Sequence, residues 1–203
     1  MKLTKAIFNH VMSDEGRYAN DPNDQGGETY CGIARKHHPN WSGWVKIDAD
    51  KEEEFNLSRD ELFEELEHEL FEFYSDYWEK VRAHLIDNEA LAYQFYQLAV
   101  TTPKGAMWSL QGTCWDSLSI DGTESTFVDG FYGKGTQAAI DELNEKMAND
   151  HFFAAEVSAA YCMRRCLYYC DSARRRPENQ KFLAGWIMRS IRNWQEAQEL
   201  GRE

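Results

Sequence analysis

The sequence is poor in the features that build membrane-spanning, disulfide-linked or repetitive proteins. None of its apolar runs approaches the roughly 20 residues of a transmembrane helix. Its five cysteines are an odd number, which argues against a disulfide framework and favours reduced thiols. There is neither an internal repeat nor a low-complexity linker. These absences predict a globular protein, and 203 residues are enough for a sizeable core.

Signatures of nucleotide and metal binding are also missing. The chain has no Walker loop, no Rossmann fingerprint and no CxxC pair. One stretch begins like a calcium-binding loop, but Gln25 and Gly32 stand where such a loop places its oxygen ligands. Cys162, Cys166 and Cys170 are spaced along one helix face rather than as in a zinc site, so we expect core thiols. We therefore expect no metal and no organic cofactor.

The N-terminus lacks the pattern of a Sec signal, because its apolar residues are spaced as on a helix and no small-residue cleavage site follows. We expect synthesis in the cytoplasm, with export or release left to another factor. The net charge of −13 is local, since residues 48–79 hold 14 of the 35 acidic residues against Lys51 and Arg59. We expect a monomer with no nucleic-acid partner and no stable membrane insertion.

What the sequence does contain is a series of helix signals. Apolar residues at helical spacing end at Asp14 and Glu15, and a capping box at Ser58 and Glu61 opens a long apolar stripe. Thr136 is a candidate N-cap. The prediction is a mostly α fold with a short loop or β region after the first helix. Further helices are predicted over 58–82, 88–100, 103–118, 136–149, 151–175 and 177–201.

Two Gly/Asp-rich breaks, residues 16–34 and 119–135, interrupt the helices. Glu15 stands at the first break, where we expect Gly16 to let the chain turn sharply away. A carboxyl held rigidly at a helix end suits a general acid, and the negative end of the helix dipole disfavours its ionisation. Asp24 and Thr29 follow in the order expected for a pair that holds a water molecule.

The stretch EGRYANDPNDQGGETYCGI resembles the E-G-G-Y-x-N-D-P-x-D-x-G-G-x-T-x-x-G-I motif of the TtsA-like, secretion-activator lysozymes, glycoside hydrolase family 108. This resemblance implies that Glu15 is the catalytic residue. Arg17 departs from the pattern, because the family usually has a second glycine there. The order of Glu15, Asp24 and Thr29 is also similar to that of phage-type lysozymes. The matching residues are Glu15, Gly16, Tyr18, Asn20, Asp21, Pro22, Asp24, Gly26, Gly27, Thr29, Gly32 and Ile33.

The resemblance covers nearly the whole chain. YSDYWEK from Tyr74 is similar to the family's Y-x-x-x-Y-W segment, and DGFYGKGT from Asp129 resembles the signature of its C-terminal peptidoglycan-binding module. FLAGWIMRSIRNW from Phe182 resembles its terminal helix. The weakest part is residues 93–104, where Gln94 replaces an aspartate of the family pattern. We interpret residues 1–100 as a lysozyme-like catalytic part and 101–203 as a helical peptidoglycan-binding part packed against it.

By resemblance, we expect a peptidoglycan hydrolase that cleaves the glycan strand as an N-acetylmuramidase. Glu15 is the expected acid, Asp24 and Thr29 its catalytic partners. The action is expected at the cell wall in the periplasm, after release through a holin or an export system. A retaining and an inverting course stay open, as do phage lysis and a secretion role. The expected substrate contacts are Tyr18, Asn20, Gly26, Gly27 and Tyr30.

Two alternative functions, each from a different class of protein, stay open. The first is a non-catalytic peptidoglycan-binding or phage-structural protein that retains the fold, against which the intact Glu15 motif argues. The second is a protein-interaction module that uses the acidic segment 48–79. Removing the charges of that segment would abolish partner binding and leave glycan cleavage intact.

Overall fold

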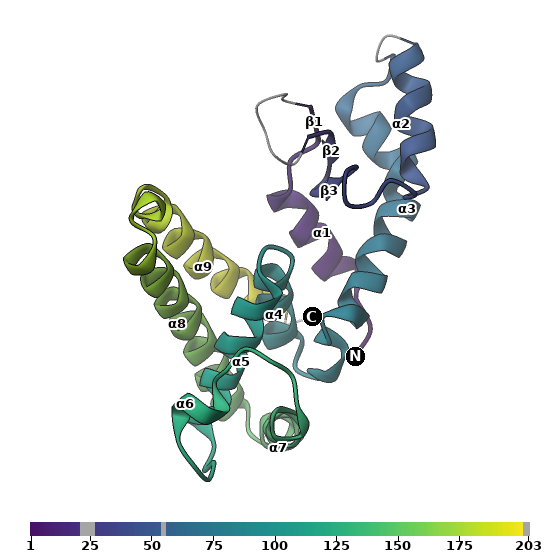
Figure 1. Cartoon of the computed structure of the whole chain (residues 1–203). Coiled ribbons are helices and arrows are strands. Elements are labelled where there is room, and N and C mark those ends of the chain that lie inside the picture. The colour runs from purple at the N-terminus through teal and green to yellow at the C-terminus, as the bar shows by residue number, and fades with distance from the viewer. Residues whose placement is uncertain (21–26, 54–55, 201–203) are drawn as a thin grey trace. The chain divides into compact units, whose positions relative to one another are not determined.

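The computed structural model describes residues 1–20, 27–53 and 56–200 (Figure 1). It is mostly helical, with a small antiparallel three-stranded sheet after the first helix, so the predicted mostly α, lysozyme-like fold is confirmed. The chain divides into two compact units, Lys2–Trp78 and Met1 with Glu79–Glu203. The division of the chain near residue 100 stays a prediction.

The N-terminal unit is a small sheet with helices on either side of it in the sequence. The strands pair in the order β1-β2-β3, with Tyr18 opposite Tyr30 and Tyr30 opposite Ile33. Its elements are α1 (Lys5–Asp14), β1 (Tyr18–Ala19), β2 (Thr29–Tyr30), β3 (Ile33–Ala34), α2 (Gly43–Glu52) and most of α3 (Arg59–Lys80).

The core of this unit follows from the helical spacing of apolar residues. The ring of Phe8 on α1 meets the ring of Phe71 on α3 edge-on, with 5.2 Å between centroids. Burial of such stripes is the main favourable term in holding the two helices in place. The predicted capping box is confirmed, since Ser58 Oγ accepts from Glu61 N and Glu61 Oε2 accepts from Ser58 N. The buried stripes are Ile7, Phe8, Val11 and Met12 on α1 and Leu62, Leu66, Leu70, Tyr74 and Trp78 on α3.

The C-terminal unit is built around α4, in which every residue from Leu91 to Ala99 is buried. A helix that is buried all round must be covered by others, and α4 packs against α5, α8 and α9. The elements are η1 (Ala83–Leu85), α4 (Glu89–Ala99), α5 (Pro103–Ser117), α6 (Glu124–Phe127), α7 (Lys134–Asn149), α8 (His151–Arg175), η2 (Pro177–Asn179) and α9 (Gln180–Leu200).

Local signals predicted most helix starts, with three exceptions. Asn88 caps α4 through its side chain and Pro103 opens α5, as predicted. Thr136 is not a cap, because α7 begins at Lys134 and the buried Thr136 hydroxyl instead binds Gln111. Helix α2, whose few apolar residues form no helical stripe, and the four-residue α6 were not predicted.

The cysteines are all reduced, as predicted. Cys31, Cys114 and Cys162 are buried, whereas Cys166 is half-buried and Cys170 is exposed. The expectation of a core thiol is therefore wrong for Cys170, because the buried face of α8 turns away from it. Among the described residues, no helix combines the length and the apolar character that a membrane span requires.

Candidate active site

Glu15 is the C-terminal cap of α1, and its own backbone is extended. Its φ and ψ are −85° and 139°, and its N–H still donates to Val11 O at 3.2 Å. The chain therefore turns away at Glu15 itself. Gly16, which we expected to let the chain turn sharply, is not among the described glycines with positive φ, and a Cβ there would meet nothing within 4 Å.

The carboxyl group of Glu15 lies against the backbone of Gly32. A Cβ atom added to Gly32 would stand 2.6 Å from Glu15 Oε2 and 2.9 Å from the Tyr74 hydroxyl oxygen. Gly32 also has a φ of +78°, which side chains other than glycine rarely adopt. The half-buried Glu15 carboxyl thus has a defined seat, which only a glycine at this position leaves open.

Gly32 belongs to a two-residue hairpin turn between β2 and β3. Cys31 and Gly32 both have positive φ, 44° and 78°, which is the pattern of a type I′ turn. Such a conformation is strained for cysteine. It is held by the buried Tyr74 of α3, whose hydroxyl donates to Cys31 O at 2.6 Å. Helix α3 therefore fixes the turn against which Glu15 rests, a role that sequence reasoning did not assign to Tyr74.

Arg17 contacts the same turn, since its guanidinium lies 3.9 Å from Cys31 Sγ. Its guanidinium lies 3.9 Å from the centroid of the Phe63 ring and donates to Met12 O at 3.3 Å. Burial raises the pKa of the Cys31 thiol to about 11, with Arg17 opposing the rise and the Glu15 carboxylate adding to it. Cys31 is therefore a neutral thiol at physiological pH, and the departure of Arg17 from the family pattern supplies a packing contact.

Four charged side chains tie the hairpin to α2. Arg35 binds Glu28 at 3.1 Å and Asp48 at 2.5 Å, and Lys51 binds the same two carboxylates. Burial opposes ionisation of Glu28, but its hydrogen bonds from Lys51 and Arg35 outweigh this and lower its pKa. The hydrogen bond from Arg35 lowers the pKa of Asp48 to about 2. Glu28 and Asp48 are therefore anions at neutral pH, unsuited to donate a proton.

Sequence reasoning missed this ion-pair set, because its members lie up to 23 positions apart and Glu28 occupies a variable position of the motif. Among the residues that the structure describes, no group of three or more His, Cys, Asp or Glu side chains is arranged to hold a metal ion.

The other predicted site residues are only partly brought together with Glu15. Thr29 is half-buried and its hydroxyl donates to Gly27 O at 3.1 Å. Gly27 has a φ of +64° with open space around its Cα, and Asn20 is exposed. Asp24 and Gly26 lie outside the described residues.

Tyr18 and Tyr30 are directly opposite each other in the sheet, so their side chains share one face of it. Successive residues of a strand point to opposite faces, which places Thr29 on the other one. The Tyr18 hydroxyl donates to Glu28 at 3.2 Å, and Tyr30 is buried. The two tyrosines therefore line a different surface from Thr29.

Two family models match separate regions of the chain. Residues 8–102 match the model of "Glycosyl hydrolase 108", and residues 117–191 match that of "Predicted Peptidoglycan domain". No curated protein matches the chain. Among solved structures, that of Brucella abortus SagA is similar, with 23% identity, 98% of each chain covered and a TM-score of 0.58, which shows a shared fold. The chain thus carries a region that matches glycosyl hydrolase 108, followed by a region that matches a peptidoglycan domain, and this combination supports a hydrolase that acts on peptidoglycan.

Proposed function

We propose that the protein is an N-acetylmuramidase that cleaves the glycan strand of peptidoglycan, with Glu15 as general acid. The observation that supports this most is the position of the Glu15 carboxyl group. It is half-buried at the end of a helix, against a glycine whose turn is fixed by Tyr74. A proton donor to a glycosidic oxygen needs such rigid and partly desolvated surroundings.

Asp24, helped by Thr29, is proposed to orient the attacking water or to stabilise the oxocarbenium-like transition state. The geometry of Thr29 supports a water-holding role. Because its proton is donated to Gly27 O, the hydroxyl oxygen is left as an acceptor for a proton of a bound water. The nucleophilic lone pair of that water would then point away from Thr29.

Glycan contacts are proposed from the segment between β1 and β2. Asn20 is exposed, and the open surroundings of Gly27 allow a sugar to approach the backbone closely. Gly26 is expected to act in the same way. Tyr18 and Tyr30 share the opposite sheet face from Thr29, and we assign them a different part of the substrate below.

The test is digestion of purified peptidoglycan by wild type and Glu15→Gln, with the new reducing ends identified. Loss of a general acid lowers the rate by about 10²–10⁴-fold. Glu64→Gln is the matched control, because Glu64 is exposed on α3. Equal release by wild type and Glu15→Gln would refute the assignment. Muramic reducing ends support the proposed linkage, and glucosamine ends would overturn it.

The cellular role is proposed as that of an endolysin released through a holin, or of a wall-editing enzyme that assists secretion. The competing proposal is a peptidoglycan-binding protein without activity. It predicts that wild type and Glu15→Gln bind the wall equally and that neither releases reducing ends.

A further inference from the structure

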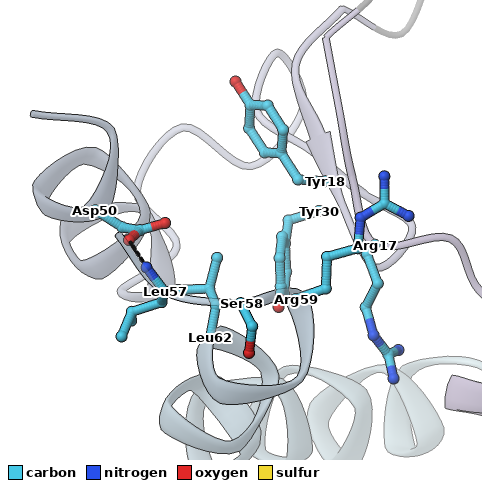
Figure 2. Close-up of a pocket in the computed structure, with 8 residues that line it drawn as sticks. All are labelled: Arg17, Tyr18, Tyr30, Asp50, Leu57, Ser58, Arg59 and Leu62. Carbon is cyan, nitrogen blue, oxygen red and sulfur yellow. Dashed lines mark hydrogen bonds between the residues drawn. The ribbon is translucent and has the colours of Figure 1, made fainter. Parts of the chain in front are cut away.

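A cavity of about 350 Å³ lies within the N-terminal unit, on the face of the sheet that carries Tyr18 and Tyr30 (Figure 2). Its other walls come from the end of α2 and the start of α3, with Asp50, Leu57, Arg59 and Leu62. This volume lies within the range of about 300–1,000 Å³ that is usual for small-ligand sites. Because Thr29 projects from the opposite face, the cavity is distinct from the proposed cleavage face.

Tyr30 gives the first indication of a ligand. Its side chain is 1% exposed, and its hydroxyl oxygen is buried without a hydrogen-bond partner among the described residues. Burial raises its pKa, so the phenol keeps its proton and is a donor at neutral pH. A buried donor without an acceptor is costly, and an acceptor atom of a ligand would remove that cost.

The charged groups of the cavity give the second indication. Arg59 is exposed and its guanidinium pairs with no carboxylate of the described residues, whereas Arg17 already binds Met12 O and Phe63. Asp50 is 6% exposed, and one of its oxygens accepts from Leu57 N at 2.9 Å. Its second oxygen has no partner in the described part of the chain. The cavity thus offers a cation, a phenol donor and a carboxylate acceptor beside leucine side chains.

We propose that this cavity binds the short peptide stem that substitutes the muramic acid residues of peptidoglycan. A peptide carbonyl would accept from the Tyr30 hydroxyl, a stem carboxylate would pair with Arg59, and an amide N–H or ammonium would donate to Asp50. Alanine methyl groups would pack on Leu57 and Leu62. This inference rests on the proposed function, since it assigns a part of that substrate to a second face of the sheet.

The direct test is an NMR titration of the full chain with three probes. They are a synthetic acidic stem tripeptide, the same peptide with every carboxylate amidated, and a peptide-free N-acetylglucosamine tetramer. We expect the acidic peptide to shift resonances of the cavity residues. Tyr30→Phe and Arg59→Gln should each weaken its binding about tenfold, the loss of one good hydrogen bond or ion pair. Arg176→Gln, an exposed arginine of the other unit, is the control and should leave binding unchanged.

Thermal unfolding separates binding from folding. Tyr30→Phe removes an unpaired buried hydroxyl, so its melting temperature should be equal to or above that of wild type. Weaker peptide binding at undiminished stability therefore reports the ligand contact. Equal binding by wild type, Tyr30→Phe and Arg59→Gln would overturn the proposal, as would shifts confined to residues outside the cavity. Tighter binding of the glucosamine tetramer than of the peptide at the cavity would overturn it as well.

Failure of this proposal and failure of the proposed function give different results. Peptide-free glycan strands should be cleaved equally by wild type and Arg59→Gln, and not by Glu15→Gln. Intact peptidoglycan should be cleaved with a raised KM by the two cavity variants. If no glycan is cleaved by wild type, the proposed function fails, while the peptide titration still decides whether the cavity is a peptide site.

Discussion

The two Gly/Asp-rich loops of this chain have similar compositions, but different residues hold them in place. The hairpin turn at Cys31 and Gly32 is held by Tyr74 of α3 and by the ion pairs around Glu28, a variable position of the motif. In the second loop, residues 129–136 contact the buried side chain of Gln111 of α5.

Gln111 is 1% exposed and uses both ends of its amide. Its nitrogen, which has two protons to donate, lies 2.9–3.0 Å from three acceptors, Asp129 Oδ1, Phe131 O and Thr136 Oγ1, and its oxygen accepts from Gly130 N at 2.7 Å. The Asp129 carboxylate also accepts from Phe131 N at 2.8 Å. The Asp and Thr of this motif are therefore used to shape the loop.

The comparison teaches where to look for chemistry in a motif. In the second loop the motif's own polar side chains are engaged in holding its backbone. In the first, residues at variable or distant positions hold the turn, and the Glu15 carboxyl is placed against it without being part of the hairpin. We therefore expect substitutions in the first loop to change activity and those in the second to change stability.

The largest expected effect is that of Gly32→Ala. The added Cβ would collide with the Glu15 carboxyl and the Tyr74 hydroxyl, and positive φ would add about 1–3 kcal/mol of strain. Displacement of the acid should lower kcat by about 100-fold. Gly16→Ala is the control, since a Cβ there meets nothing and should leave the melting temperature unchanged. A fully active Gly32→Ala would show that Glu15 does not need this seat.

Gln111→Ala should come next, through stability alone. It leaves Gly130 N and Thr136 without their buried partner, which should cost about 2–4 kcal/mol of unfolding free energy. Chemical denaturation measures this, and the exposed Gln195→Ala is the matched control. Cleavage of peptide-free glycan per folded molecule should stay at the wild-type rate. A large loss of that rate would contradict the proposal that the second loop affects stability and not activity.

Tyr74→Phe tests whether the contact from α3 holds the hairpin turn of the first loop in place. It removes the hydrogen bond to Cys31 O, with an expected cost of about 1 kcal/mol. The hairpin should also become less rigid, so kcat should fall while KM changes little. Tyr77→Phe, one helical turn from the hairpin contact, serves for comparison. Unchanged kcat in Tyr74→Phe would mean that the turn is held without this hydroxyl.

The smallest effect is expected from pH and the Arg35–Asp48 ion pair. The folded pKa of Asp48, about 2, lies below its unfolded value of about 3.9. The stabilisation is therefore present above about pH 4 and is lost as the pH falls toward 2. Asp48 is 42% exposed, so solvent screening keeps the contribution small. In Arg35→Gln the free energy of unfolding should fall less between about pH 4 and pH 2 than in wild type. An equal fall in both proteins would mean that other carboxylates cause it.

Much of the secondary structure and one half of the site were predictable from local patterns. The capping box at Ser58, the cap at Asn88 and the placement of Glu15 at a helix end each involve residues within one helical turn. The misassigned Thr136 shows the limit of such patterns. Its hydroxyl is suited to capping a helix, but in the core it accepts a hydrogen bond from Gln111, which lies 25 positions earlier in the chain.

Neighbouring residues in the chain thus specified most of the helices and the position of the acid, because capping and apolar spacing act over a few residues. The surroundings of that acid depended on packing. Tyr74 reaches a carbonyl 43 positions away, and Gly32 makes room for Glu15 only once the hairpin and α3 have come together. The cavity beside Tyr30 likewise exists only between folded elements, since its walls come from two strands, the end of one helix and the start of another.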